Sequence, residues 1–358
     1  MSEKWTIITG ACGGLGRAFV NELAAKGENV FLTGTNEAKT SAWAGELKKR
    51  YPYVKIDYAV MDLSCAQSRA ALFDTLRERE INASRLINNA GMIVEGAMLD
   101  LGEEKTIKAI ETNCVGTADM MQKFIGAFGD GVEILNVSSL GAFQPMPFMG
   151  VYSSTKRMIL DLSLAVREEV KNRNIKVCVV CPGGIYTTDE MKKAIASQGL
   201  GGKLSSHQPE YVARYALRKF AKNKAIIIPG AFNRFLKFIG KIPSETFVAK
   251  TVGKRWERAN KKRENNSLKK IKNKMKSGGL FMKRKKLLII VSILVAIALA
   301  GTGFYLVENR IADKSGPLEL YGNVDIREVN LAFQIPERVK EILVEEGDLV
   351  RKGDKLGT

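Results

Sequence analysis

Ser139, Tyr152 and Lys156 have the residue types and the spacing of a proton-transfer site. Lys156 follows Tyr152 by four residues, so on a helix the two side chains share one face. A tyrosine with a pKa of about 10 is a poor base at neutral pH, and a nearby ammonium group favours its phenolate form. Ser139 stands thirteen residues before Tyr152 and can hold a substrate oxygen. The pattern predicts acid–base chemistry at a carbonyl or alcohol group.

A glycine-rich turn near the N-terminus predicts a dinucleotide site. The run TGACGGLG begins at Thr9, after an apolar strand, and opens an amphipathic helix expected over Leu15–Lys26. Gly10 and Gly14 let the backbone approach a pyrophosphate, and Gly16 permits close helix packing. The unpaired N–H groups of the helix N-terminus favour an anion at the same place.

The ends of the next strands carry further candidates for nucleotide binding. An NAD site usually has an acid after the second strand, where this chain reads Gly34-Thr35-Asn36. The missing acid favours NADP(H), with Arg17 or Lys39 as the phosphate partner, while Glu37 keeps NAD(H) open. Asp62 follows the third strand and suits either the adenine end of the nucleotide or the N-cap of the next helix.

These motifs need a fold that brings strand ends together. Strand-like and helix-like segments alternate through residue 230, which predicts a parallel sheet covered by helices on both faces. Such sheets bind ligands at the carboxyl ends of their strands, where every motif falls. The expected strands are Trp5–Thr9, Asn29–Thr33, Lys55–Val60, Ser84–Asn88, Glu133–Val137, Lys176–Val180 and Ala225–Ile228.

Residues 1 to about 250 resemble a short-chain dehydrogenase/reductase. The matching pieces are Thr9-Gly10-x-x-x-Gly14-x-Gly16, Asp62, Asn88-Asn89-Ala90-Gly91, Asn113, Ser139, Tyr152-x-x-x-Lys156 and Pro182-Gly183 with Thr187. The resemblance implies a Rossmann-like, doubly wound sheet of seven parallel strands, NAD(P)(H)-dependent carbonyl/alcohol chemistry and a segment from Pro182 to Thr187 that closes over the nicotinamide. It implies the catalytic tetrad Asn113, Ser139, Tyr152 and Lys156. The implied cofactor-binding residues are Thr9, Gly10, Gly14, Leu15, Gly16, Thr35, Asp62, Leu63, Asn89, Ala90, Gly91, Tyr152, Lys156, Pro182, Gly183 and Thr187.

The stretch before the tyrosine bears on the substrate. Residues 142–149 are mostly apolar and are similar to the ketoacyl- and hydroxysteroid-reducing branch of the family. We therefore expect a hydrophobic small-molecule carbonyl or alcohol, such as a 3-ketoacyl thioester. The resemblance also allows a homo-oligomer. A fold kept only as a nucleotide-binding module is disfavoured by the intact tetrad.

Charge and cysteine content exclude other classes of function. Of the net charge of +18, residues 254–286 supply most, with fifteen Lys/Arg against two acids. The excess is therefore local, and nucleic-acid binding is not expected. The five cysteines indicate a reducing cytoplasm, and Cys178 and Cys181 lie on an expected strand with opposite orientations. With His207 as the one histidine, no metal site is expected.

The chain after the reductase region has a different character. Residues 231–252 mix phenylalanines with basic residues and suit either a helix packed on the fold or one lying on a membrane surface. Residues 287–307 carry no charge and span about 31 Å as a helix, close to a bilayer core of about 30 Å. Basic residues precede this stretch, so the reductase would face the cytoplasm, with no N-terminal signal peptide.

The last segment resembles the N-terminus of an HlyD-like membrane-fusion protein, the periplasmic adaptor of export pumps. The resemblance covers residues 282–358 and implies a partial lipoyl-like β-hairpin domain. We divide the chain into a reductase domain (1–253), a basic linker (254–286), a transmembrane helix (287–307) and this partial β domain (308–358). Either two adjacent bacterial reading frames are joined, the second belonging with a pump, or the chain is a membrane-tethered reductase.

Overall fold

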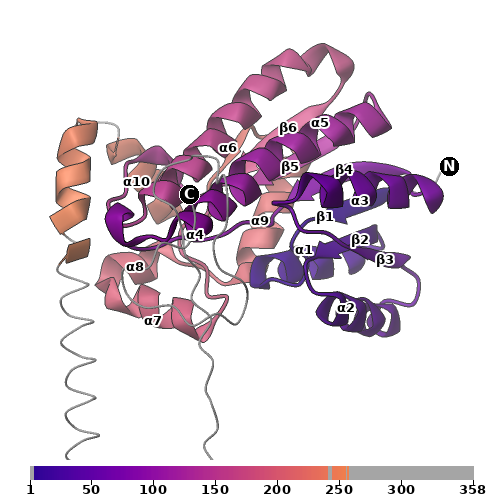
Figure 1. Ribbon diagram of the computed structural model, residues 1–358, viewed down its shortest axis with the longest axis horizontal. Coiled ribbons are helices and arrows are strands. Elements are labelled where there is room, and N and C mark those ends of the chain that lie inside the picture. The colour runs from indigo at the N-terminus through magenta and orange to yellow at the C-terminus, as the bar shows by residue number, and fades with distance from the viewer. Residues whose placement is uncertain (1–3, 241–243, 255, 258–358) are drawn as a thin grey trace, which may run out of the picture. The chain divides into compact units, whose positions relative to one another are not determined.

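A parallel sheet forms the centre of the fold. The computed structural model describes residues 4–240, 244–254 and 256–257. Its seven strands are ordered β3-β2-β1-β4-β5-β6-β7, and every neighbouring pair is parallel (Figure 1). The strands are β1 (Trp5–Ile8), β2 (Asn29–Gly34), β3 (Ile56–Val60), β4 (Ala83–Asn88), β5 (Glu133–Val137), β6 (Lys176–Val180) and β7 (Ile226–Ile227). The predicted doubly wound sheet of seven parallel strands is confirmed, with bounds within two residues of those expected.

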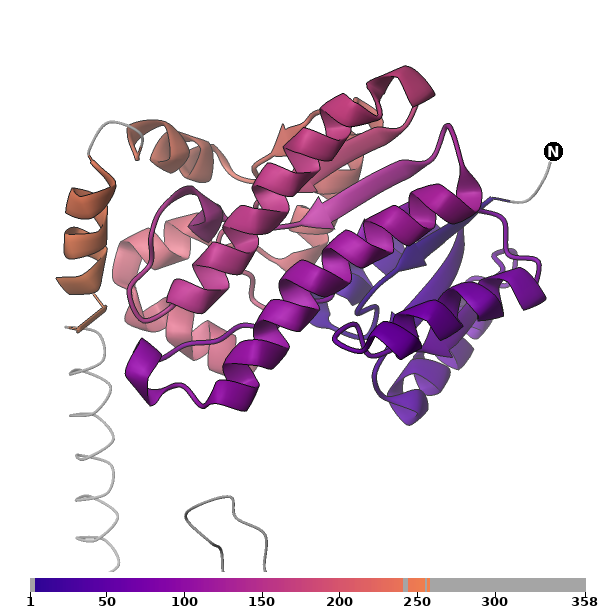
Figure 2. The same cartoon turned by 45° about the horizontal axis from the view of Figure 1, so that its top comes forward.

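Helices cover both faces of the sheet because consecutive strand residues point to opposite faces. In β1, Ile8 packs in one apolar cluster with α1 (Gly14–Ala24), α2 (Glu37–Arg50) and α9 (Pro209–Ala221). Its neighbour Ile7 packs in another with α3 (Ala66–Glu78) and α5 (Thr117–Phe128). The long helix α6 (Gly150–Glu169) runs beside α5 on this second face (Figure 2).

The strand order changes direction at the centre of the sheet. From β1 the chain proceeds outward to β2 and β3, and then returns to β4 on the other side of β1. Helices that follow β1 and β4 therefore diverge to opposite faces and leave a crevice at the carboxyl ends of these strands. The glycine-rich turn follows β1 and the Asn-Asn-Ala-Gly run follows β4, so both reach this crevice.

Short elements complete the carboxyl-end side of the sheet. They are the 3₁₀ turns η1 (Met98–Asp100) and η3 (Leu140–Phe143), the helices α4 (Glu103–Ile110), α7 (Asp189–Ser197), α8 (Gly199–Ser205) and α10 (Ala231–Ile239), and a π-helical segment, η2 (Glu111–Gly116). A further 3₁₀ turn, η4 (Lys171–Arg173), lies after α6. Residues 245–254 are helical.

The described residues reach only the start of the C-terminal segments. No helix in the described ranges is long and apolar enough to cross a bilayer. The predicted span 287–307 and the segment that resembles a membrane-fusion protein lie outside the described residues, and both stay predictions. Residues 231–239 form a helix, and Asn233 in it is buried against the fold. This agrees with the interpretation of these residues as a helix packed on the fold.

Candidate active site

The glycine-rich turn is held against the end of β4 by side chains that the sequence singled out. The Thr9 hydroxyl accepts from the backbone N–H groups of Asn89 and Ala90, both at 3.0 Å. The Asn89 amide donates to the carbonyls of Thr9 (2.9 Å) and Gly10 (3.1 Å). Gly10 has a φ of +63°, and a Cβ there would lie 2.9 Å from the Ala90 Cα. Only glycine fits this close, left-handed position.

The N-terminus of α1 opens into a large cavity. Gly13, the N-cap, has no side chain to satisfy the first N–H groups of the helix, and Gly13, Gly14 and Leu15 all line the cavity. Gly14 has no Cβ, and an added one would meet the Thr187 methyl group at 2.6 Å. Unpaired N–H groups at a helix start, reached without a side chain in the way, fit the pyrophosphate of a dinucleotide.

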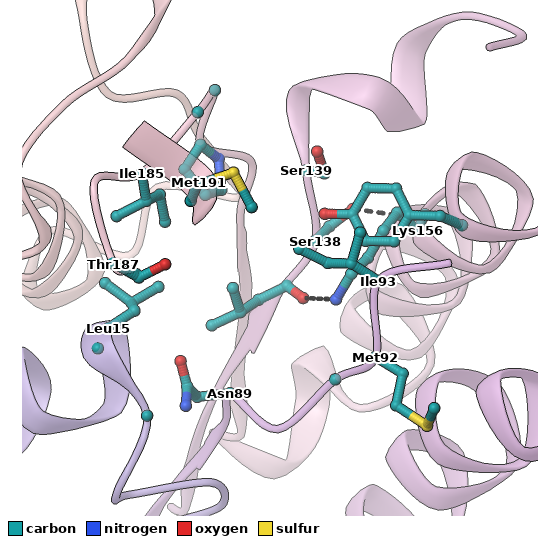
Figure 3. Close-up of a pocket in the computed structure, with 18 of the residues that line it drawn as sticks. Leu15, Asn89, Met92, Ile93, Ser138, Ser139, Lys156, Ile185, Thr187 and Met191 are labelled. Atoms are coloured by element: carbon teal, nitrogen blue, oxygen red, sulfur yellow. Dashed lines mark hydrogen bonds between the residues drawn. The ribbon is translucent and has the colours of Figure 1, made fainter. Parts of the chain in front are cut away.

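The cavity measures about 1280 Å³, more than a single small ligand requires. It brings together sixteen of the predicted site residues: Gly10, Gly14, Leu15, Gly16, Thr35, Asp62, Leu63, Asn89, Ala90, Gly91, Ser139, Tyr152, Lys156, Pro182, Gly183 and Thr187. The two other predicted residues, Thr9 and Asn113, lie behind its wall and hold residues that line it. In Figure 3, Ser139 and Lys156 face Leu15 and Thr187 across the cavity.

Tyr152 and Ser139 interact at the inner wall of this cavity. Burial raises the pKa of the Tyr152 hydroxyl, and a hydrogen bond with the Ser139 side chain partly offsets the rise. The sequence led us to expect Lys156 to favour the phenolate. The net shift of the tyrosine's pKa is upward, because burial outweighs the effects that lower it, and the Lys156 ammonium group, 5.9 Å from the ring centroid, donates to a backbone carbonyl. The tyrosine is therefore a protonated hydroxyl at neutral pH.

Lys156 is almost fully buried, with 4% of its surface exposed. Its Nζ donates to the Val137 carbonyl at the end of β5 (2.9 Å), as Figure 3 shows. Burial lowers the pKa of Lys156 to about 8, because the charged form loses its hydration. This group therefore exchanges protons closer to neutral pH than an ordinary lysine does.

Asn113 lies in the π-helical segment η2, which interrupts the α4–α5 helix. Its Oδ1 accepts from the Met92 N–H (2.8 Å), and its Nδ2 donates to the Met92 carbonyl (2.9 Å) and the Thr155 hydroxyl (3.0 Å). A Cβ added to Gly91 would lie 3.1 Å from Lys156 Nζ and 3.2 Å from Asn113 Oδ1. The missing side chain thus lets both groups pack closely against Gly91. Such π-bulges occur often at functional sites.

The far end of the candidate nucleotide crevice follows β2 and β3. Asn36 caps α2 by accepting from the Lys39 N–H (2.9 Å). Asp62 accepts from the N–H and hydroxyl of Ser64, and these bonds lower its pKa. Its interpretation as a helix N-cap was wrong, because α3 begins later and has Cys65 as its N-cap. The Asp62 carboxylate instead stabilises the turn before the helix.

Two of the three charged side chains near this end have defined partners. Arg17 stacks over the Trp43 ring at 4.2 Å and donates to the Cys12 carbonyl (3.3 Å). Glu37 accepts from the Tyr58 hydroxyl (2.9 Å) and is not among the described residues that line the cavity. Lys39 does line it.

Two residues of the site carry no signal of their own in the sequence. Ser138, next to Ser139, donates to the Lys156 carbonyl (2.6 Å) and fixes α6 against β5. Thr155 precedes Lys156 and joins α6 to Asn113. Their place beside a motif residue was the one sequence signal for a role in the site, because serine and threonine alone are too common to indicate one.

The cysteines form no cross-link in this part of the chain, where all five are free. Burial raises the pKa of Cys178 to about 11 and that of Cys181 to about 12. The expected strand at Cys178 is confirmed as β6. Within the described residues, no group of His, Cys, Asp and Glu has the arrangement of a metal site.

Comparison with known proteins settles the family. Residues 4–199 match the short chain dehydrogenase family, which is more than half of the chain. The chain belongs to this family. Curated relatives that match it are named as a reductase and a dehydrogenase. The match does not extend to residues 282–358, so their resemblance to a membrane-fusion protein stays a prediction.

Several curated relatives resemble this dehydrogenase over its N-terminal part. A very-long-chain 3-oxoacyl-CoA reductase of Caenorhabditis briggsae is 28% identical over 195 residues, which are 51% of this chain and 60% of the relative. The chain thus spans less than two thirds of that relative. A diacetyl reductase of Staphylococcus epidermidis is 30% identical over 58% of this chain and 84% of its own. A 7beta-hydroxysteroid dehydrogenase of Mediterraneibacter gnavus is 28% identical over 63% and 85%.

Solved structures agree with this fold. A 7beta-hydroxysteroid dehydrogenase structure has a TM-score of 0.63 and 25% identity, covering 70% of this chain and 96% of that one. A short-chain dehydrogenase from Sphingobium yanoikuyae, in complex with NADPH, has a TM-score of 0.55 and 25% identity, covering 66% and 93%.

Proposed function

We propose that this dehydrogenase reduces the carbonyl group of a hydrophobic substrate, such as a 3-ketoacyl thioester, with NADPH. The observation that carries the proposal is the arrangement of the half-buried Ser139 and Tyr152 with the buried Lys156 in the cavity that the glycine-rich turn also lines. NADPH, when bound, supplies the hydride. The chain's own residues orient the carbonyl and provide the proton.

In this proposal Tyr152 is the proton donor. Its raised pKa keeps the hydroxyl protonated at neutral pH, so it can transfer a proton to the carbonyl oxygen as negative charge develops there. Ser139 donates a hydrogen bond to the same oxygen and orients it. General acid catalysis of this kind contributes about 10²–10⁴ in rate.

Lys156 and Asn113 would return the proton. Lys156 has a pKa of about 8, so it can give up and regain a proton near neutral pH. In this proposal a water molecule lies beside Lys156 and Asn113. That water would connect the buried lysine to solvent, which restores the tyrosine hydroxyl after each turnover.

The contacts of Glu37 and Arg17 support NADP(H) over NAD(H). The Glu37 carboxylate is engaged by Tyr58, so it is a poor partner for the ribose hydroxyls of NAD(H). Arg17 is held by Trp43 and Cys12 at the glycine-rich turn, and Lys39 lines the cavity. Either cation would pair with a ribose phosphate, and the absence of an acid from residues 34–36 removes the competing charge.

The substrate end of the cavity supports a hydrophobic ligand. Four methionines line it, from three separate segments: Met92, Met146, Met149 and Met191. Methionine side chains adapt to bulky apolar ligands. Ile93, Phe232 and Leu236 add further apolar surface. Two of the three relatives described above are named for large apolar substrates, a very-long-chain acyl thioester and a steroid.

Steady-state NADPH oxidation tests the proposal. We expect a long-chain 3-ketoacyl thioester to give a higher kcat/KM than diacetyl. Tyr152→Phe should lower kcat by about 10²–10⁴ with little change in KM for NADPH. Tyr53→Phe, at a ring that is 94% exposed, is the matched control. Equal activity of Tyr152→Phe and wild type would refute the assignment, and faster turnover of diacetyl would refute the substrate class.

A further inference from the structure

Helix α10 presents apolar side chains to two different environments. Phe232 and Leu236 line the large cavity. Beside them on the same apolar face, Phe235 is 56% exposed, Phe238 is 70% exposed and Ile239 is 36% exposed. Side chains three and four residues apart lie on one helix face, so these three form a continuous apolar ridge. The core does not need this ridge, and large exposed apolar residues grouped on one helix mark an interaction surface.

A basic cleft adjoins the ridge. It measures about 680 Å³, and Phe238 of the ridge forms part of its wall. Its cationic lining consists of Lys219, Lys222, Lys224, Arg234 and Lys237. Among the described residues that line it, none is acidic. Five cations with no acid between them create a positive potential that attracts anions.

The cations of this cleft are arranged around aromatic rings. The Arg234 guanidinium donates to the Tyr215 hydroxyl (3.1 Å), and Lys219 Nζ lies 5.7 Å from the centre of the same ring. Lys237 Nζ lies 4.7 Å from the centre of the Phe143 ring. These contacts hold cationic groups beside the ridge.

We propose that α10 and the basic cleft dock this dehydrogenase on an anionic lipid surface. The phenylalanines of the ridge would enter the boundary between headgroups and acyl chains, as the apolar faces of interfacial helices do. The lysines of the cleft would pair with lipid phosphates, each contributing about 1 kcal/mol near such a surface.

Charge favours this occupant over a second copy of the chain. A symmetric contact through this face would place the same basic cluster close to its equivalent, and like charges repel. An anionic bilayer offers charge of the opposite sign together with an apolar layer for the ridge. In the sequence, the basic run 254–286 follows the same region and adds fifteen Lys/Arg.

Docking would place the bilayer next to the proposed substrate end of the cavity. The buried Asn233 of α10 donates to the carbonyls of Ser205 and Pro229, both at 2.9 Å. The helix is thus fixed to Ser205, which packs against Gly183. Access of an apolar substrate from the bilayer rests on the proposed function, whereas the docking itself does not.

Hydrogen exchange of the full chain with vesicles tests the docking. Because residues beyond 257 can also bind lipid, the measurement has to report on α10 itself. We expect vesicles of phosphatidylcholine with phosphatidylglycerol to slow amide exchange in residues 231–239, and pure phosphatidylcholine to have little effect. Residues 37–50 of α2 are the internal reference. Unchanged exchange in α10 with anionic vesicles would overturn the proposal.

Two double variants identify the groups responsible. Phe235→Ser with Phe238→Ser should weaken the lipid protection of α10 about tenfold, because it removes apolar surface from the interface. Lys222→Glu with Lys224→Glu should weaken it at least 25-fold, from about 1 kcal/mol for each lysine. The control is Tyr53→Ser, which removes a ring that is 94% exposed on another face.

A measurement of mass distinguishes the alternative occupant. If the phenylalanine variant dissociates a dimer in sedimentation and leaves vesicle protection unchanged, a second copy covers the ridge and the proposal fails. Reduction of a soluble substrate should be retained in both double variants. Loss of lipid protection with retained activity supports the docking surface. The proposed function is tested separately, by the NADPH oxidation assay.

Discussion

Replacing Lys156 by methionine should make the fold more stable at neutral pH. Burial lowers the pKa of Lys156 from 10.5 to about 8, whereas the unfolded chain keeps the ordinary value. Folding at pH 7 therefore buries a charged ammonium group, at a cost of about 3 kcal/mol. The variant also loses the hydrogen bond from Nζ to the Val137 carbonyl (2.9 Å), and this loss offsets about 1–3 kcal/mol of the stability gained by removing the buried charge. A net gain of about 1 kcal/mol is expected at pH 7.

The pH dependence separates the burial cost from the hydrogen bond. A lysine whose folded pKa is depressed costs most stability below that pKa, and the cost disappears as pH rises through the unfolded value. The advantage of Lys156→Met over wild type should therefore shrink by about 2.5 kcal/mol between about pH 7 and about pH 10. The unpaired Val137 carbonyl does not titrate, so above about pH 8.5 the variant should become the less stable protein.

Urea unfolding followed by circular dichroism measures this difference. Wild type, Lys156→Met and the control Lys49→Met, at an exposed position of α2, are compared across the pH range. The control should differ from wild type by a constant amount. A difference for Lys156→Met that also stays constant with pH would refute the depressed pKa. The same variant should lose about 10²–10⁴ in the rate of NADPH oxidation, which links the buried charge to catalysis.

Three further outcomes are expected. Gly14→Ala should raise KM for NADPH about tenfold, because the added Cβ would lie 2.6 Å from the Thr187 methyl group. The control Gly45→Ala, whose Cβ would have nothing within 4 Å, should leave KM unchanged and stabilise α2 by about 1 kcal/mol. Steady-state kinetics measure the KM of both variants, and thermal unfolding measures their stability. Arg17→Ala should lower the kcat/KM preference for NADPH over NADH at least tenfold, from the loss of a charged hydrogen bond, and an unchanged ratio would exclude Arg17 as the phosphate partner. Asp119→Asn should lower the unfolding free energy by about 3 kcal/mol, because its partner cation is buried, and a urea midpoint equal to that of wild type would contradict this.

The positions of the main motifs followed from the sequence because each depends on local rules. The turn at Gly10 and Gly14 needs residues without a Cβ, and an i, i+4 pair such as Tyr152 and Lys156 must share a helix face. Strands such as β5 have apolar cores with polar residues at their ends. The parallel sheet then followed from the alternation with helices, whereas the order of its strands came from the structure.

The electrostatic state of the site did not follow from the sequence. Lys156 was expected to favour the Tyr152 phenolate. Its ammonium group instead donates to the Val137 carbonyl, and burial dominates the pKa of both groups. The prediction that Asp62 is the N-cap of the next helix was wrong, because that helix begins four residues later. Both errors concern distances and burial, which adjacent residue types do not encode.

The sequence alone determined the class of fold, the crevice at the strand ends and the residue types that line it, because backbone conformation and strand–helix alternation are properties of short segments. Tertiary structure decided what those residues do together. It set the burial that shifts the pKa of Lys156, the contact of Thr187 with Gly14 and the exposure of the apolar ridge of α10. These depend on segments far apart in the chain, and the free energy of a buried charge depends on everything that surrounds it.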